Sequence, residues 1–266
     1  MNKVYACYPG GKHKALTMSY DDGRTQDRRL VSIFNEYGIR GTFHLNSGRL
    51  QEENRIHPDE IPVLYKGHEI ACHTMTHPTI ARCPLPETAA EVLEDRKALE
   101  RITGTPVRGM SYPNGSYSDE IVRLLPGLGI RYSRITGNSG GFLLPADPYR
   151  WMATCHHNHD LMELGDQFLG LFKKQYLYLM YVWGHSYEFD DKNNWDLMES
   201  FCAMMGGKDD IWYCTNIEFM DCMDDYARLQ FAADNSFVYN PNAGDCCIAV
   251  NDGTAIRIPA GVTIKL

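Results

Sequence analysis

Two adjacent carboxylates follow an apolar run near the start of the chain, in the stretch ALTMSYDDG at residues 15–23. Asp21 and Asp22 repel each other when both are ionised, so placing them side by side calls for a reason. An Asp-Gly pair after a strand is also a common turn signal, which gives a plain structural alternative. The pair therefore becomes a candidate site only if other reactive side chains gather at the same place.

The stretch HTMTH supplies such side chains, because His73 ends a predicted strand, HEIACH at residues 68–73, and His77 follows it. Their spacing of four predicts that one helical turn places both imidazoles on the same side, where they could bind a transition metal. Two histidines and one carboxylate leave coordination positions open for water, as catalytic metal sites do. With the strand ending before Gly23, one aspartate can bind the metal while its neighbour takes a proton from water. Two surface histidines near a proline are the alternative for this pair taken alone.

The elements that must position these residues alternate between short apolar strands and amphipathic helices from about residue 14 to residue 230. The clearest helix is PETAAEVLEDRKALERITG, with proline and acids at its start and glycine at its end. Alternation of this length predicts an α/β fold whose parallel strands close into a distorted (β/α) barrel. Functional residues of such barrels lie at the C-terminal ends of strands, which is where both candidate pairs stand.

The alternation of predicted strands and helices ends after Gln230. Residues 231–266 show no helical period and contain NDG, a strong hairpin signal, between the strand-like segments CCIAV and TAIRI. We expect a barrel formed by residues 1–230 and a small antiparallel β-hairpin appendage, formed by residues 231–266, packed on it.

Charge and hydropathy exclude several classes of partner. The 266 residues include 26 Lys and Arg against 34 acidic residues, for a formal charge of −8, and no basic cluster indicates nucleic acid. The longest apolar stretch, YLYLMYVWG, is too short to span a bilayer, so no membrane partner is expected. The start MNKVYACYPGGKHK lacks the apolar core of a signal peptide, which favours a cytoplasmic protein. The sequence leaves the oligomeric state open.

Four stretches in order, TMSYDDG, HTMTH, SYPNG and WGHSYEF, resemble the motifs of the polysaccharide deacetylases, the NodB-homology enzymes of carbohydrate esterase family 4. The resemblance covers residues 14–230 and implies the distorted (β/α) barrel of that family. It implies a hydrolase that removes acetyl groups from N-acetylated sugars, and in some members from O-acetylated sugars. It also implies one divalent metal ion, with zinc favoured over cobalt, nickel, manganese or iron.

The resemblance further implies a role for each matching residue. A metal-bound water is the nucleophile, Asp21 the catalytic base and His185 the acid toward the leaving amine. The implied metal ligands are Asp22, His73 and His77. Tyr112 falls near the motif whose backbone N–H helps to stabilise the oxyanion. The arginine of the family's third motif is missing here, and DPYRW at residues 147–151 resembles the fourth motif only superficially. We expect Arg134, in RYSRIT, to orient Asp21 instead.

Several alternatives stay open at this point. The histidines of CHHNHD, which include His156 and His157, either bond within a polar loop or line the same pocket. His44 either faces the metal or is a buried, satisfied core residue. Rival functions are hydrolysis of a small cyclic amide or imide on the same barrel, and non-catalytic carbohydrate binding, which a retained base and acid argue against. A mononuclear iron oxygenase also uses two histidines and a carboxylate, typically on another architecture.

Overall fold

The computed structural model describes residues 2–251, 253 and 255–266. Its strands are β1 Val4–Cys7, β2 Lys14–Asp21, β3 Gly41–Leu45, β4 Glu69–Cys72, β5 Gly109–Ser111, β6 Tyr132–Asn138, β7 Trp151–Ala153, β8 Cys155–His156, β9 Tyr178–His185, β10 Ile211–Tyr213, β11 Gln230–Phe231, β12 Phe237–Tyr239, β13 Cys246–Val250, β14 Ala255–Ile258 and β15 Thr263–Lys265. Its α-helices are α1 Asp27–Glu36, α2 Ile61–Leu64, α3 Leu85–Thr103, α4 Asp119–Leu124, α5 Leu161–Leu169, α6 Glu188–Asp191, α7 Trp195–Met205 and α8 Asn216–Arg228.

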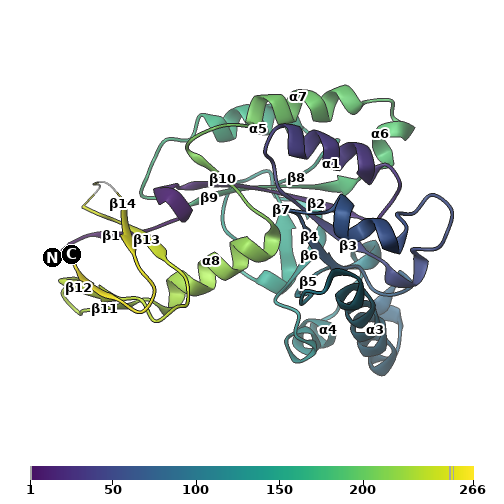
Figure 1. Ribbon diagram of the computed structural model, residues 1–266, viewed down its shortest axis with the longest axis horizontal. Coiled ribbons are helices and arrows are strands. Elements are labelled where there is room, and N and C mark those ends of the chain that lie inside the picture. The colour runs from purple at the N-terminus through teal and green to yellow at the C-terminus, as the bar shows by residue number, and fades with distance from the viewer. Residues whose placement is uncertain (1, 252, 254) are drawn as a thin grey trace.

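The central sheet has nine strands, with eight in the order β7-β6-β5-β4-β3-β2-β9-β8 and β10 paired to β2. All of its pairings are parallel. Strand β7 pairs with β6, and β8, which starts two residues after β7 ends, pairs with β9. One short segment therefore joins the two ends of the sheet and closes it into the predicted (β/α) barrel, with helices around the outside (Figure 1).

Apolar patterning explains how the barrel packs. All eight residues of β2 are buried, as expected for a central parallel strand covered on both faces. Helix α1 buries Leu30, Val31, Ile33 and Phe34, the apolar stripe of an amphipathic helix, against the core. Removing this apolar surface from water, at about 25 cal/mol per Å², is the main stabilising term for such a layer.

Parallel pairing aligns the C-terminal strand ends along one rim of the barrel. The last residue of β2, Asp21, is the register partner of His44 on β3 and of His185 on β9. Strand β4 ends at Cys72, directly before His73, and β5 ends at Ser111. The fold therefore gathers the predicted reactive residues from β2, β4 and β9 at this rim.

Two small antiparallel sheets lie beside the barrel, at the left of Figure 1. One has the order β11-β12-β15, and the other has the order β1-β13-β14. The N-terminal strand β1 thus pairs with β13, a contribution that the sequence analysis did not foresee. The predicted hairpin of CCIAV and TAIRI is present as β13 and β14, although residue 252 of its NDG turn and residue 254 of TAIRI lie outside the described residues. The division at residue 230 stays a prediction.

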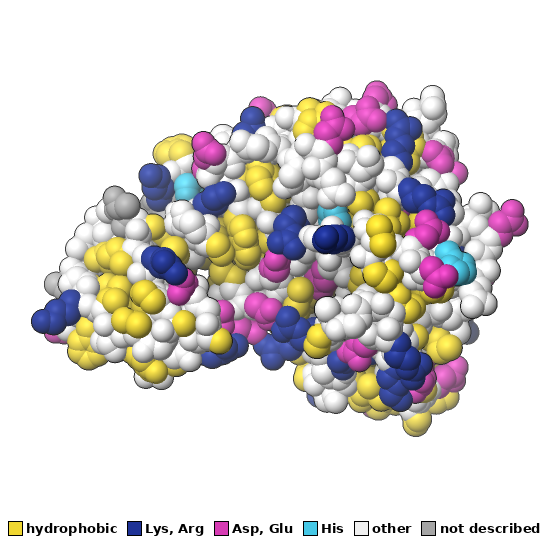
Figure 2. All heavy atoms as spheres, viewed as in Figure 1, with side chains coloured by type: hydrophobic (Ala, Val, Ile, Leu, Met, Phe, Trp, Pro, Cys, Tyr) yellow, Lys and Arg dark blue, Asp and Glu magenta, His cyan; other side chains and the backbone are white. Residues whose placement is uncertain are grey.

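Acidic and basic side chains are interspersed over the face drawn in Figure 2, with apolar atoms between them. Among the described helices, none combines the length and the apolar character needed to cross a bilayer.

Candidate active site

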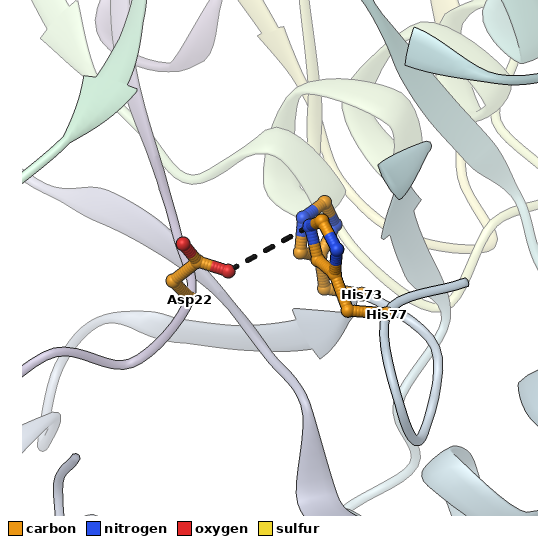
Figure 3. Close-up of side chains that lie close together, drawn as sticks. All are labelled: Asp22, His73 and His77. Carbon is orange, nitrogen blue, oxygen red and sulfur yellow. Dashed lines mark ion pairs between the residues drawn. The ribbon is translucent and has the colours of Figure 1, made fainter. Parts of the chain in front are cut away.

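Asp22, His73 and His77 converge at the rim of the barrel. One ligand atom of each lies within 4.8 Å of those of the other two, in an arrangement that could hold a metal ion. The Asp22 Oδ1 and His77 Nε2 atoms are 3.8 Å apart, and the two imidazole centroids are 4.8 Å apart. Figure 3 shows the carboxylate, at the end of β2, pointing toward both rings.

The donor set fits a divalent metal. His73 Nδ1 lies 2.9 Å from the carbonyl oxygen of Ser111, a contact that needs the ring proton on Nδ1. That proton leaves a lone pair on Nε2, the usual arrangement for a metal-binding histidine. Within the described part of the chain, nothing donates a hydrogen bond to the buried Oδ1 of Asp22. Arg55 Nη1 forms an ion pair with this oxygen at 3.6 Å, beyond hydrogen-bond distance, so a bound cation would supply the direct partner that the oxygen lacks.

The backbone at these ligands is unusual, and it corrects one expectation. His73 and His77 do not share a helical turn, because a loop follows β4 at Cys72. Thr74 and His77 adopt φ values of 62° and 65°, which lie in the left-handed region that non-glycine residues rarely occupy. Asp22 likewise has a φ of 82°. Such strained positions cluster at functional sites, and two of these three residues, Asp22 and His77, belong to the three-ligand cluster.

Gly23 permits the turn that lets neighbouring aspartates face the same site. Its φ is 61°, and an added Cβ would stand 2.8 Å from Leu45 Cδ2. Strand β2 ends at Asp21, so Asp22 is not forced to the opposite face of the sheet. The Asp22 N–H is satisfied by the carbonyl oxygen of His44 at 2.9 Å.

Asp21 has a separate set of partners. Ser111 Oγ donates to its Oδ1 at 3.0 Å, and the Arg134 guanidinium donates to its Oδ2. Asp21 is 3% exposed and Arg134 is 1% exposed, so this ion pair is buried. The expected approach of Arg134 to Asp21 is therefore present as a contact, while its role in orienting a base stays a proposal.

Electrostatics keep the carboxylate of Asp21 ionised and the imidazole of His73 neutral. Burial favours the neutral form of Asp21, but Arg134 and the surrounding imidazoles outweigh burial and hold the pKa of this carboxyl well below its usual range. Burial lowers the pKa of His73 to about 4, despite the attraction of Asp21. The carboxylate is thus ionised, and the imidazole is neutral, as a metal ligand must be.

His185 stands beside Asp21 at the end of β9 and is bound by a carboxylate. Its Nδ1 lies 2.9 Å from Glu188 Oε1. Burial lowers the pKa of His185, but Glu188, Asp21 and Asp22 raise it more, so the pKa lies above its ordinary value. The Nδ1–H donated to Glu188 leaves Nε2 as the atom that can exchange a proton with a substrate.

Glu188 is the centre of a second cluster, with His156 and His157. Both Nε2 atoms lie 3.1 Å from Glu188 Oε2. The Nδ1 of His156 accepts the Asn158 N–H at 3.2 Å, and the Nδ1 of His157 has no partner among the described residues. The Nε2 of His156 is therefore free to donate to Glu188, whereas the Nε2 of His157 faces both Glu188 Oε2 and the Asn158 Nδ2 atom, which lies 2.9 Å away.

This second cluster differs from the first in its link to His185. Its two imidazoles face one oxygen of Glu188, and the other oxygen of Glu188 contacts His185 Nδ1. Burial disfavours ionisation of Glu188, yet hydrogen bonds from His156, His157 and His185 lower its pKa far below its usual range. His156 and His157 thus belong to the polar network behind His185.

Two other candidate residues, Tyr112 and His44, lie outside the three-ligand cluster. Tyr112 points away from the ligands, since its hydroxyl donates to the Tyr149 carbonyl oxygen at 2.9 Å. Its N–H donates to the Arg134 carbonyl oxygen at 3.0 Å and is not free for an oxyanion. His44 is fully buried, with Nδ1 3.4 Å from Asp21 Oδ1, so it faces the candidate base rather than the three-ligand cluster.

Two residues of the site were missed in the sequence analysis. Glu188 stands three residues after His185, and that spacing within HSYE is the signal that could have found it. Ser111 contacts both Asp21 and His73, because its Oγ lies 2.7 Å from His73 Nδ1. A serine before Tyr-Pro carries no distinctive pattern, so its contacts required the structure.

Comparison with known proteins agrees with the resemblance that the motifs carry. The sequence model of the polysaccharide deacetylase family matches residues 9–133, just under half of the chain. A chitooligosaccharide deacetylase of Bradyrhizobium sp. is 28% identical over 45% of this chain and 49% of its own length. The chain thus spans about half the length of the curated relatives that it matches.

Solved structures agree on the fold. A protein from Mycobacterium smegmatis assigned to the polysaccharide deacetylases is 15% identical, with a TM-score of 0.61 over 85% of this chain and 95% of that chain. PuuE allantoinase is also 15% identical, with a TM-score of 0.63 over 80% of this chain and 91% of that chain. At these identities the likeness concerns the barrel alone. The family match over residues 9–133 thus confirms the resemblance that the motifs carry, and the solved structures agree with it in the barrel.

Proposed function

We propose that this chain is a metal-dependent deacetylase that hydrolyses acetyl groups on the nitrogen or oxygen of sugars. The observation that carries the proposal is the pairing of two carboxylates with separate partners. Asp22 joins two histidines in a set of three ligands, whereas Asp21 stays outside that set and binds Ser111 and Arg134. A site that only binds a metal has no use for the second carboxylate.

Asp22, His73 and His77 would hold the metal, and two nitrogens with one oxygen suit zinc among the divalent ions. When bound, such an ion lowers the pKa of water and polarises the acetyl carbonyl. Asp21 accepts the proton of the attacking water, and its low pKa keeps it ionised over the whole working range. Arg134 and Ser111 fix the carboxylate in one orientation.

His185 serves the step in which the leaving group departs. With Nδ1 bound to Glu188, its protonated Nε2 donates to the departing amine or alkoxide. The raised pKa of His185 keeps this proton available near neutral pH.

A backbone N–H near Tyr112 would stabilise the oxyanion, and the hydrogen bonds of this turn favour Asn114 as its source. The N–H groups of Tyr112 and Gly115 are engaged at 3.0 Å each, and Pro113 has none. Asn114, in the same turn with a φ of 55°, is the remaining residue whose N–H could donate.

The test is acetate release by protein that has been stripped of metal and reloaded with zinc, over a panel of N- and O-acetylated sugars. Metal content is measured on the same samples, and the expected value is one equivalent. The panel includes a cyclic imide. Turnover of the imide without acetate release would replace the proposal with cyclic amide hydrolysis, and metal binding without any turnover would favour a binding protein.

A further inference from the structure

The loop at residues 73–77 carries two of the three candidate metal ligands, His73 and His77, and has no regular secondary structure of its own (Figure 3). Thr74 and His77 have left-handed φ values of 62° and 65°, which cost free energy that other contacts must supply. The backbone N–H and C=O groups of such a loop also need partners from elsewhere in the fold. These partners set the positions of the two imidazoles.

The turn that follows β3 binds the carbonyl groups of the loop. Asn46 Nδ2 lies 2.5 Å from the His73 carbonyl oxygen and 3.0 Å from that of Thr74. The Gly48 N–H donates to the Met75 carbonyl oxygen at 3.0 Å. An added Cβ on Gly48 would stand 2.8 Å from the same oxygen, so the turn lies directly against the loop. Three consecutive carbonyl groups of the loop are therefore held by one turn.

Asp95, on helix α3, joins the first residue of the loop to that turn. Its Oδ2 accepts the His73 N–H at 3.0 Å, and its Oδ1 accepts the Ser47 N–H at 2.7 Å. Asp95 is fully buried, so removing its carboxylate would leave two backbone N–H groups without these partners. One side chain of α3 thus fixes the backbone of a candidate metal ligand.

Glu91 holds the middle of the same loop. It stands four residues before Asp95, so the two carboxylates share one face of α3. Its Oε2 accepts the Thr76 N–H at 2.8 Å, and its Oε1 accepts the Thr76 hydroxyl at 2.7 Å. Its backbone carbonyl oxygen also accepts the Met75 N–H at 3.1 Å. Helix α3 therefore binds N–H groups at three of the five loop residues.

A third carboxylate of α3 shows that this arrangement is specific to one face of the helix. Glu94 is exposed and forms an ion pair with Lys97 at 2.6 Å. Glu91 and Asp95 form no ion pair with any residue that the structure describes, and they bind backbone N–H groups instead. Their hydrogen bonds serve the loop rather than the surface of the helix.

Building on the proposed function, we propose that Glu91 and Asp95 are positioning residues for the metal. Both act through the backbone of residues 73–77, and they hold the loop in the conformation that presents His73 and His77 to an ion beside Asp22. A loop that is ordered in advance loses little entropy when the ion binds. Changes to the groups that orient metal ligands typically weaken metal binding about 10–100-fold.

The test measures the zinc dissociation constant of the full chain by competition with a chelator. We expect Glu91→Ala to weaken zinc binding about tenfold. Glu91→Gln should stay near wild type, because its amide oxygen can accept the Thr76 N–H and its NH₂ can donate to the Thr76 hydroxyl oxygen. Glu94→Ala is the matched control, since it removes the same side chain from the same helix without touching the loop.

Urea denaturation of the metal-free variants separates positioning from general stability. Glu91 is only partly buried, so the midpoint for Glu91→Ala should equal that for Glu94→Ala. Equal zinc affinities in these two variants would overturn the inference. Asp95→Asn can accept only one of the two N–H groups, so we expect weaker zinc binding there too, and wild-type affinity in folded Asp95→Asn would count against the inference. The Glu91 variants decide alone if Asp95→Asn does not fold.

Hydrogen exchange of the metal-free protein keeps the inference separate from the proposed function. Protection of the Thr76 amide in wild type, and its loss in Glu91→Ala but not in Glu94→Ala, supports the role of α3 without metal or turnover. Weaker zinc binding in Glu91→Ala, with no acetate released by wild type from any sugar, would overturn the proposed function and leave the inference standing. Acetate release with unchanged exchange and zinc affinity in Glu91→Ala would do the reverse.

Discussion

Glu188 Oε1 lies 2.9 Å from His185 Nδ1, while the other oxygen of Glu188 is held by the imidazoles of His156 and His157. The carboxylate is therefore fixed on both sides. It belongs to the short helix α6 that follows β9, so the same stretch of chain supplies the candidate acid and the group that orients it.

Replacing Glu188 tests this relationship. The Glu188→Gln substitution removes the charge that helps to raise the pKa of His185, so burial dominates and the pKa falls. Since the acid must be protonated, activity is lost as pH rises through that pKa. We expect the basic limb of the kcat/KM profile to move to lower pH in Glu188→Gln. An unmoved limb, or the same shift in the exposed control Glu163→Gln, would contradict the role of Glu188.

The second prediction concerns Arg134, whose ion pair with Asp21 is buried. Breaking a buried pair by removing one partner costs about 3–5 kcal/mol, since the other charge stays buried. Arg134→Met should lower the free energy of unfolding by about that amount, measured with urea on metal-free protein. The pKa of Asp21 should also rise, which moves the acid limb of the activity profile to higher pH.

Arg108→Met is the matched control for Arg134. Arg108 forms a two-bond pair with Asp221, at 2.8 and 2.7 Å, but both side chains are more than one third exposed. Such surface pairs contribute about 0–1 kcal/mol. Equal losses of stability in the two variants would show that the Arg134–Asp21 pair is not strengthened by burial.

The barrel could be predicted from sequence because strand and helix periods are local signals. The pairing of β1 with β13 could not, since its partners Val4 and Val250 are at opposite ends of the chain. Closure through the short segment that carries β7 and β8 also depends on pairing with β6 and β9, which no local period encodes.

The candidate ligands could be proposed from residue type and their place at strand ends. Their geometry could not, because the spacing of His73 and His77 fits a helical turn, while the chain forms a loop with left-handed residues. The carboxylate behind His185 was missed for a different reason. Glu188 is held by His156 and His157, which are about 30 residues away in sequence. These residues come together only through the pairing of β8 with β9.

Glu69 should make stability depend on pH. Burial raises its pKa to about 7, although Tyr132, Thr42 and the Ile217 N–H all donate to it. A carboxyl group with a raised pKa stabilises the fold fully below its unfolded pKa and loses that contribution as pH rises through the folded value. Between about pH 4.5 and pH 7 the free energy of unfolding should fall by up to about 1.4 kcal/mol per pH unit from this group.

Glu69→Gln keeps the shape and removes the titration. Its amide oxygen can accept from Thr42 and Ile217, and its NH₂ can donate to the Tyr132 hydroxyl. We expect a flatter dependence of unfolding free energy on pH than in wild type, measured by urea denaturation from pH 4.5 to pH 7.5. The exposed control Glu36→Gln should follow wild type, and a parallel curve in Glu69→Gln would count against the buried carboxyl.

The C-terminal segment 231–266 should serve stability rather than substrate choice. Its strand β13 covers one edge of β1, and Asn242 bonds to the Asp225 carbonyl oxygen of α8 at 2.7 Å. Deleting the segment exposes an unpaired strand edge, which promotes aggregation. Ile248→Ala, at a fully buried position of β13, should lower stability by about 2–4 kcal/mol. A soluble, equally stable truncation with altered preference among acetylated sugars would show that the segment selects substrate.

The last prediction separates the neighbouring aspartates. Asp21→Asn removes the base but leaves Asp22, His73 and His77 intact, so metal content should stay near one equivalent while turnover falls by about two to four orders of magnitude. Asp22→Asn removes one ligand of three, so the metal should dissociate more readily and activity should return partly with excess zinc.

The contrast between Asp21→Asn and Asp22→Asn tests which aspartate is the base and which is the metal ligand. Loss of the base should lower turnover, whereas loss of the ligand should lower metal content. His185→Ala should resemble Asp21→Asn in keeping its metal, yet should spare acetyl esters with good leaving groups, which need little help from an acid. Metal analysis and acetate release on the same samples distinguish the cases. If Asp21→Asn loses the metal while Asp22→Asn keeps it, the two roles are reversed. If both variants keep the metal, the three-ligand cluster does not hold it, and the adjacent aspartates are an ordinary turn at the end of β2.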